Sequence, residues 1–159
     1  MRKVLTPYRP KARYIPKAVK HEQNLQRSIC NYLRVKYPNV IFRSDYASGL
    51  HLTMNQAMTH KSLQSGNSWP DLFIYHPSRG FHGMALELKK DGTAIYVTRG
   101  PRKGEMVAQE HIQKQDAMLQ ALRHEGYFAS FAIGYDKTIG LIDWYLNPNY
   151  TAAEAQTLF

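Results

Sequence analysis

The sequence has little cysteine, no long apolar run and no glycine-rich phosphate loop, and each absence removes a class of function. A single cysteine, Cys30, excludes an internal disulfide framework and a cysteine-based zinc cluster, and it favours a reducing, cytoplasmic location. No apolar run approaches the roughly 18 residues of a membrane span, and the basic N-terminus lacks the apolar core of a signal peptide. Without a phosphate loop, nucleotide hydrolysis is not indicated. The 159 residues predict one domain large enough to bury a core.

Acidic residues are few relative to basic ones, and the excess of positive charge is concentrated near the N-terminus. The chain has 21 lysines and arginines against 12 aspartates and glutamates, which gives a net charge of +9. Residues 1–20 contain basic groups and no acid, and prolines and tyrosines are interspersed among them. Because clustered cations attract a polyanion, we favour binding to a phosphate backbone over the alternative of a solvated tail. The basic residues of this segment are Arg2, Lys3, Arg9, Lys11, Arg13, Lys17 and Lys20.

Hydrophobic periodicity predicts helices that alternate with strands. Leu25, Ile29 and Leu33 recur at helical spacing, and Asp136 is expected to N-cap the last helix. The predicted helices cover residues 21–37, 53–63, 105–124 and 136–146, the predicted strands cover residues 40–43, 72–75, 84–88 and 127–133, and residues 91–104 are assigned to a loop or a ragged hairpin. This order predicts an α/β sandwich with helices on both faces of a mixed sheet.

Three charged residues lie at the ends of apolar segments that are predicted to be buried strands. Glu87 and Lys89 are two residues apart, so they share one face of a strand, and burying both is unfavourable unless something pairs with them. The simple alternative is a structural salt bridge between the two. Asp71 follows Pro70 at the start of the preceding strand, and a hairpin would bring it near Glu87 or Lys89. Two adjacent carboxylates repel each other unless a cation lies between them, and oxygen ligands favour Mg²⁺ or Mn²⁺ over zinc.

Two further polar residues fall on otherwise apolar helical stripes. Glu22 is three residues before Leu25, and Gln115 lies between Ile112 and Leu119. Each alone has an ordinary explanation, since Glu22 could be a first-turn acid that matches the helix dipole and Gln115 could be a satisfied core amide. Together with the three charged residues of the strands, they predict a site at which polar groups from two helices and two strands converge.

This combination of residues resembles the PD-(D/E)xK nuclease superfamily, and within it the VRR-NUC branch in the short stand-alone form of phage and prophage genomes. The resemblance is carried by Glu22 … Gly66-x-x-x-Pro70-Asp71-Leu72 … Glu87-Leu88-Lys89 … Gln115 … Gly126-Tyr127. It implies a restriction-endonuclease-like core with a central mixed sheet and the order α-β-β-β-α-β. That core would occupy residues 20–146, between a basic flexible arm at residues 1–19 and a tail at residues 147–159.

The resemblance also implies a role for each site residue. The ligands of a Mg²⁺ or Mn²⁺ ion would be Asp71, Glu87, the carbonyl oxygen of Leu88 and, directly or through water, Glu22. Lys89 would orient or help to deprotonate the attacking water, and Gln115 would position that water or Lys89. The metal would lower the pKa of its bound water and neutralise the charge that grows on the phosphorus oxygens.

The resemblance therefore implies a metal-dependent endonuclease that hydrolyses phosphodiester bonds in DNA. Its substrate would be branched DNA such as a Holliday junction, and it would act as a homodimer in the cytoplasm of a bacterial host if a phage or prophage encodes it. Two alternatives stay open, a non-catalytic nucleic-acid-binding protein and a sequence-specific restriction-type endonuclease.

Several residues outside the pattern could border such a site. Lys90 is assigned to the nucleic-acid-binding surface. Arg99, Arg102 and Lys103 could extend this surface as a basic rim, or they could belong to a solvated loop. Asp45, together with Arg43, would lie near the site if the strand at residues 40–43 adjoins the strand that begins at Leu72.

Overall fold

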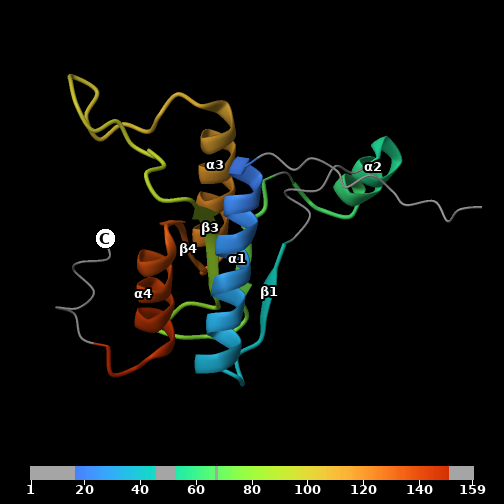
Figure 1. Cartoon of the computed structure of the whole chain (residues 1–159), viewed down its shortest axis with the longest axis vertical. Coiled ribbons are helices and arrows are strands. Elements are labelled where there is room, and N and C mark those ends of the chain that lie inside the picture. The colour runs from blue at the N-terminus through green and yellow to red at the C-terminus, as the bar shows by residue number, and fades with distance from the viewer. Residues whose placement is uncertain (1–16, 46–52, 67, 151–159) are drawn as a thin grey trace, which may run out of the picture.

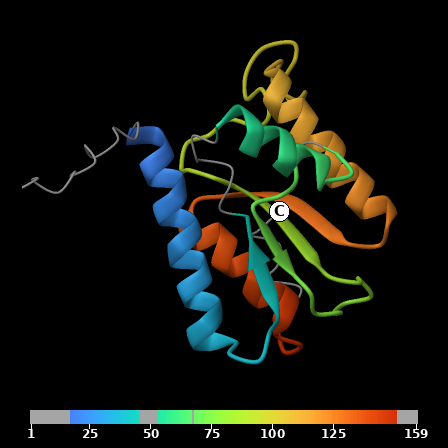
Figure 2. The ribbon, with the colours of Figure 1, turned by 90° about the vertical axis from the view of Figure 1, so that its right-hand side faces the viewer.

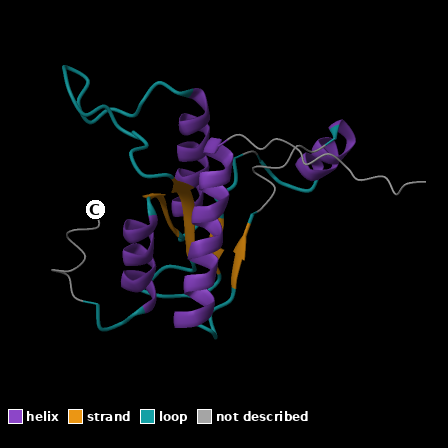
Figure 3. Ribbon diagram, viewed as in Figure 1, coloured by secondary structure: helices purple, strands orange, loops and turns teal. Residues whose placement is uncertain are grey.

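The chain folds into the predicted α/β class with a four-stranded mixed sheet. The computed structural model describes residues 17–45, 53–66 and 68–150, and for residues 17–22 it describes the backbone alone. The elements are α1 (Lys17–Lys36), β1 (Phe42–Ser44), α2 (Met54–Ser62), β2 (Leu72–Ile74), β3 (Met84–Lys89), α3 (Glu110–His124), β4 (Phe128–Ile133) and α4 (Tyr135–Leu146) (Figure 3). The sheet order is β1-β2-β3-β4, with antiparallel pairing up to β3 and parallel pairing between β3 and β4. Both the order of elements and the mixed sheet confirm the predicted fold.

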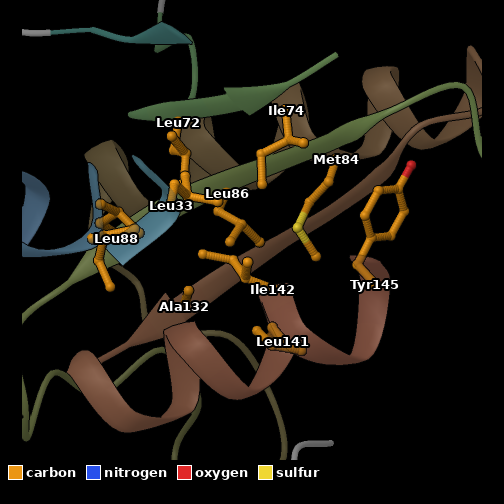
Figure 4. Close-up of a cluster of buried hydrophobic side chains, with 11 residues drawn as sticks. Leu33, Leu72, Ile74, Met84, Leu86, Leu88, Ala132, Leu141, Ile142 and Tyr145 are labelled. Atoms are coloured by element: carbon orange, nitrogen blue, oxygen red, sulfur yellow. The ribbon is translucent and has the colours of Figure 1, made fainter. Parts of the chain in front are cut away.

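Helices cover both faces of the sheet, as the sequence predicted. Helices α1 and α4 pack on one face and α3 on the other, whereas α2 stands away from these layers and buries no residue (Figures 1 and 2). The larger core forms on the α1/α4 side (Figure 4), from Ile29, Leu33, Leu72, Ile74, Met84, Leu86, Leu88, Ala132, Leu141, Ile142 and Tyr145. Burying each large apolar side chain contributes about 1.5–3 kcal/mol, so this core accounts for much of the folding free energy.

Strand β3 crosses the centre of the molecule with all six residues buried. Leu86 and Leu88 point into the core under α1 and α4. Ala85 packs in the smaller cluster under α3, and in a strand the residues two and four positions later, Glu87 and Lys89, share its face. The predicted alternation is therefore confirmed, and it directs a carboxylate and an amine into the layer between the sheet and α3.

The starts of α1, α3 and α4 differ from the prediction. Helix α1 begins at Lys17, four residues before the predicted start. Helix α3 begins at Glu110, because residues 105–107 pair with residues 95–97 before the helix starts. The assignment of Asp136 as an N-cap was wrong, since Gly134 occupies the N-cap of α4 with φ of 76° and Asp136 lies in the first turn. By contrast, α2 begins with a capping box at Thr53, within the predicted range of residues 53–63.

Parts of the predicted organisation lie outside the described residues. These include residues 1–16 of the predicted arm and residues 151–159 of the predicted tail. Residues 17–19 of the predicted arm belong to α1. Over the ranges that the structure does describe, no helix has the length and apolar character required to cross a bilayer.

A polar cluster joins the C-terminal end of α1 to α4. Asp143 accepts hydrogen bonds from the Tyr32 hydroxyl at 2.6 Å and the Tyr37 hydroxyl at 2.8 Å. The Lys36 ammonium lies 2.8 Å from the same carboxylate. Burial, reinforced by Asp143, raises the pKa of both tyrosines, and the hydrogen bond to Asp143 raises the pKa of Lys36. All three groups therefore hold their protons more tightly in the folded state than in the unfolded chain.

We expect Asp143→Ala to lower the free energy of unfolding by about 2 kcal/mol at pH 7, because three donors lose a common acceptor. Since the pKa values are raised by folding, their contribution is complete below about pH 10 and is lost as the pH rises further. Urea denaturation between pH 7 and about pH 11 measures both effects. The difference between wild type and variant should shrink above about pH 10. A difference that stays constant over the whole range would contradict this account of the cluster.

Candidate active site

The start of β2 and the end of β3 bring two of the predicted metal ligands together. The two strands pair Leu72 with Leu86, and this register puts Asp71 level with Glu87. The Asp71 carboxylate oxygen Oδ2 accepts a hydrogen bond of 3.0 Å from the backbone N–H of Leu88. Asp71 thus lies beside the strand segment that carries the Glu87-Leu88-Lys89 sequence.

Glu87 is the centre of a buried polar network. It is 3% exposed, and Lys89 is 9% exposed. The Lys89 ammonium donates to Glu87 Oε1 at 2.9 Å, and the Gln115 amide of α3 donates to the same oxygen. The simple salt bridge considered from the sequence is therefore present, but it also includes the polar residue that interrupts the apolar stripe of α3. Two donors fix the position of the Glu87 carboxylate.

The backbone of β3 presents a further oxygen toward Asp71. The Lys89 carbonyl accepts a hydrogen bond of 2.8 Å from the Gly134 N–H, so Lys89 directs its backbone groups toward the β4 side. Backbone groups alternate along a strand, and the N–H and C=O of one residue leave it on the same side. Since the Leu88 N–H points at Asp71, the Leu88 carbonyl faces the same side.

Gln26 of α1 holds the ends of β1 and β2 together, and sequence reasoning missed it. Its side-chain amide donates to the carbonyl of Asp45 at 2.7 Å and to that of Asp71 at 3.3 Å. It is buried, three residues before Ile29 and seven before Leu33, on the core-facing stripe of α1. A polar residue on that stripe was the signal that could have found it.

The pairing of β1 with β2 brings another acid to this end of the sheet. Ser44 pairs with Leu72, and the Asp45 N–H donates to the Asp71 carbonyl at 2.9 Å. The condition under which Asp45 would lie near the site is therefore met. Because residues opposite each other in antiparallel strands share a face, Asp45, Asp71 and Glu87 follow one another across three strands.

The other predicted site residues are only partly placed. Glu22 lies in α1, one helical turn before Gln26, and Lys17 and Lys20 lie in the same helix, where the structure describes only the backbone. Lys90 is exposed directly after β3. The remaining cations of the predicted nucleic-acid-binding arm, Arg2, Lys3, Arg9, Lys11 and Arg13, lie outside the described residues.

The donor set fits a small, hard divalent cation. Among the described residues, no three Asp, Glu, His or Cys side chains gather as a metal-binding group. Mg²⁺, however, is commonly held by one or two carboxylates, with water and substrate phosphate as its other ligands. Asp71 and Glu87 supply such a pair beside the Leu88 carbonyl. Gln115 adds a buried Oε1 that has no hydrogen-bond partner among the described residues, an acceptor suited to a bound water.

The fold is shared with a known structure. A solved protein described as a VRR_NUC domain protein has a TM-score of 0.51 and 24% sequence identity, covering 79% of this chain and 88% of that chain. No family model matches the sequence, and no curated protein matches it either. At this level of identity, the likeness shows the fold of the chain.

Proposed function

We propose that this chain is a nuclease of the VRR-NUC type, an endonuclease that hydrolyses phosphodiester bonds in DNA with Mg²⁺ or Mn²⁺. The observation that carries the proposal is the placement of Asp71 level with a buried Glu87 that is bonded to both Lys89 and Gln115. A fold shared with a VRR_NUC domain protein supports it. The alternative of a purely structural salt bridge does not account for a second carboxylate on the adjoining strand.

Each residue of the network has a task in this proposal. Asp71, Glu87 and the Leu88 carbonyl would hold the ion, with Glu22 as a further ligand. When bound, the ion would supply positive charge to the phosphate and acidity to a water molecule. Lys89, held 2.9 Å from Glu87, would offset phosphate charge and orient the attacking water. Gln115 would fix Glu87 through its amide nitrogen and accept a hydrogen bond from that water through its oxygen.

The proposed substrate is branched or otherwise structured DNA, cut by a homodimer. A net charge of +9 favours a polyanionic substrate, and a two-fold symmetric dimer would present two sites to two strands. The preference for branched DNA comes from the resemblance of the sequence to stand-alone VRR-NUC proteins.

A cleavage assay on two substrates tests the proposal. A labelled four-way junction and a linear duplex of the same sequence are incubated with the protein and Mg²⁺, beside the Asp71→Asn variant. We expect metal-dependent nicking by the wild type, faster on the junction, and none by the variant. Cleavage of the duplex at fixed positions would favour a restriction-type enzyme instead. Binding without cleavage of either substrate would favour a non-catalytic DNA-binding protein.

The basic N-terminal segment gives a separate prediction about affinity. Deletion of residues 1–16 keeps α1 intact, since this helix begins at Lys17. We expect weaker DNA binding and a slope of log K against log salt that falls by about 0.9 for each lost phosphate contact. Titration of a fluorescent duplex at several salt concentrations measures the slope. An unchanged slope would refute the role of this segment.

A further inference from the structure

The connection between β3 and α3 is a hydrogen-bonded hairpin, which we call the 95–107 hairpin. The Val97 N–H donates to the Glu105 carbonyl at 2.8 Å, and the Val107 N–H donates to the Ile95 carbonyl at 3.0 Å. Tyr96 and Met106 form a bridge between these bonds. At the base, Ile95 is only 3% exposed and anchors the hairpin to the body of the protein. The backbone pairing and this anchor therefore fix the direction in which the hairpin leaves the body of the protein.

The hairpin leaves the body at the candidate active site. It starts five residues after Lys90, which directly follows β3, and it ends shortly before α3, the helix that carries Gln115. Figure 1 shows the hairpin projecting from this end of the molecule, on the opposite side from α2. Both projections are connections at the same end of the sheet, since α2 lies in the segment between β1 and β2. The sheet end that holds Asp71 and Glu87 is thus flanked by two projections.

The hairpin does not pack directly against the unpaired edge of β4. A cavity of about 310 Å³ lies between its base and that strand. Ile95 and Tyr96 line the cavity from the hairpin, and Ser130 and Phe131 line it from β4. Residues 98–105 beyond this base are all exposed and contain no large apolar side chain. Burial of apolar surface therefore gives no reason for the length of the hairpin.

The tip of the hairpin concentrates positive charge. Arg99, Arg102 and Lys103 are exposed, and Glu105 is the one acid in residues 98–105. Arg102 forms an ion pair of 2.7 Å with Glu105, but both side chains are more than half exposed. Such a pair contributes little to stability, so Arg102 can exchange Glu105 for another anion. Among the described residues, none forms an ion pair with Arg99 or Lys103. Two or three cations are consequently available to an anion.

We infer that the 95–107 hairpin binds duplex DNA. Its tip cations contact phosphates that flank the phosphate at the active site. The inference rests on the proposed nuclease function. The chain runs for about three residues beyond Ile95 before it turns at residues 99–104, a reach of roughly 10 Å at about 3.3 Å per residue. Each DNA strand carries one phosphate for about every 3.4 Å of helix axis, so this reach places the tip cations near phosphates within a few nucleotides of the cleavage point. A two-stranded ribbon is also narrow enough to enter the major groove.

The inference is tested with the full chain carrying Arg99→Gln, Arg102→Gln and Lys103→Gln together. Binding to a fluorescent duplex is measured without divalent metal between about 50 and 200 mM salt. We expect Kd at about 150 mM salt to rise roughly tenfold, and the slope of log K against log salt to fall by about 2 to 3. Where the wild type cleaves DNA, single-turnover cleavage at saturating DNA should stay within about twofold of the wild type, because the hairpin tip does not touch the reacting phosphate.

Two controls separate a phosphate contact from other effects. Arg99→Lys with Arg102→Lys keeps the charges and should bind as the wild type does. Arg34→Gln removes an exposed arginine near the opposite end of α1 and should leave the salt slope unchanged. Thermal unfolding of every variant verifies that the fold is intact.

The possible outcomes separate the role of the hairpin in DNA binding from the role of the active site in cleavage. If the wild type binds but does not cleave DNA, the proposed nuclease function fails, and the salt slopes still measure the hairpin contact. Wild-type affinity and slope in the triple variant would overturn the inference. Loss of cleavage at saturating DNA would overturn it as well, because the hairpin would then act on the chemistry rather than on binding.

Discussion

Asp71→Asn and Glu87→Gln should each lower the rate of Mg²⁺-dependent DNA cleavage by about a thousandfold or more. Both changes keep the shape of the side chain and remove its charge. The asparagine can still accept the Leu88 N–H, and the glutamine can still accept from Lys89, so the fold should persist. Single-turnover assays measure the rate, and DNA affinity should change by less than about threefold, since these residues hold the ion rather than the duplex.

The matched control for these variants is Asp116→Asn. Asp116 follows Gln115 on α3, and its carboxylate bonds to Gln120 of the same helix rather than to the network around Glu87. The Asp116→Asn substitution removes one negative charge near the site and leaves the proposed ligands unchanged, so cleavage should stay near the wild-type rate. Wild-type cleavage by both the Asp71 and the Glu87 variants would rule out the proposed metal site.

Lys89→Met should lower the free energy of unfolding by about 3 kcal/mol in the absence of divalent metal. The change removes the ammonium that pairs with Glu87, while that carboxylate stays buried. The double variant that combines Lys89→Met with Glu87→Gln should regain most of the lost free energy of unfolding, because it no longer buries an unpaired carboxylate. Urea denaturation of the two single variants and the double variant gives the coupling energy between the residues.

Addition of Mg²⁺ distinguishes a metal site from a structural ion pair. In Lys89→Met, a bound cation would supply the positive charge that Glu87 has lost, so Mg²⁺ should stabilise this variant more than the wild type. The contrary result would be that Mg²⁺ stabilises neither protein and that the effects of Lys89→Met and Glu87→Gln on the free energy of unfolding are additive. Glu87 and Lys89 would then be neither energetically coupled nor part of a cation site.

The fold was predictable because its apolar residues have clear periods. Strand β3 is buried on both faces, and α1, α3 and α4 bury one stripe each, so the order of these elements follows from hydrophobicity. Two boundaries depend on contacts that periodicity does not report. The start of α3 is delayed by backbone pairing between residues 95–97 and 105–107, and α4 is capped by Gly134, whose positive φ is not visible in a hydrophobic pattern.

The candidate site was predictable where a polar residue interrupts a buried pattern. Glu87, Lys89 and Gln115 gave that signal, and the structure places them in one network. Gln26 gave the same signal but escaped notice, because its role is to bond two backbone carbonyls rather than another polar side chain. The pairing of Asp45 with Asp71 depends on the position of β1 at the sheet edge, which a sequence reports only as a possibility. The predicted contribution of Glu22 stays a prediction.

The most direct measurement of the central claim is the anomalous scattering from a crystal of the protein soaked in Mn²⁺. We expect a peak between the carboxylates of Asp71 and Glu87, at about 2.1 Å from an oxygen of each. A map without a peak at that end of the sheet, or with the ion held by other acids, would contradict it.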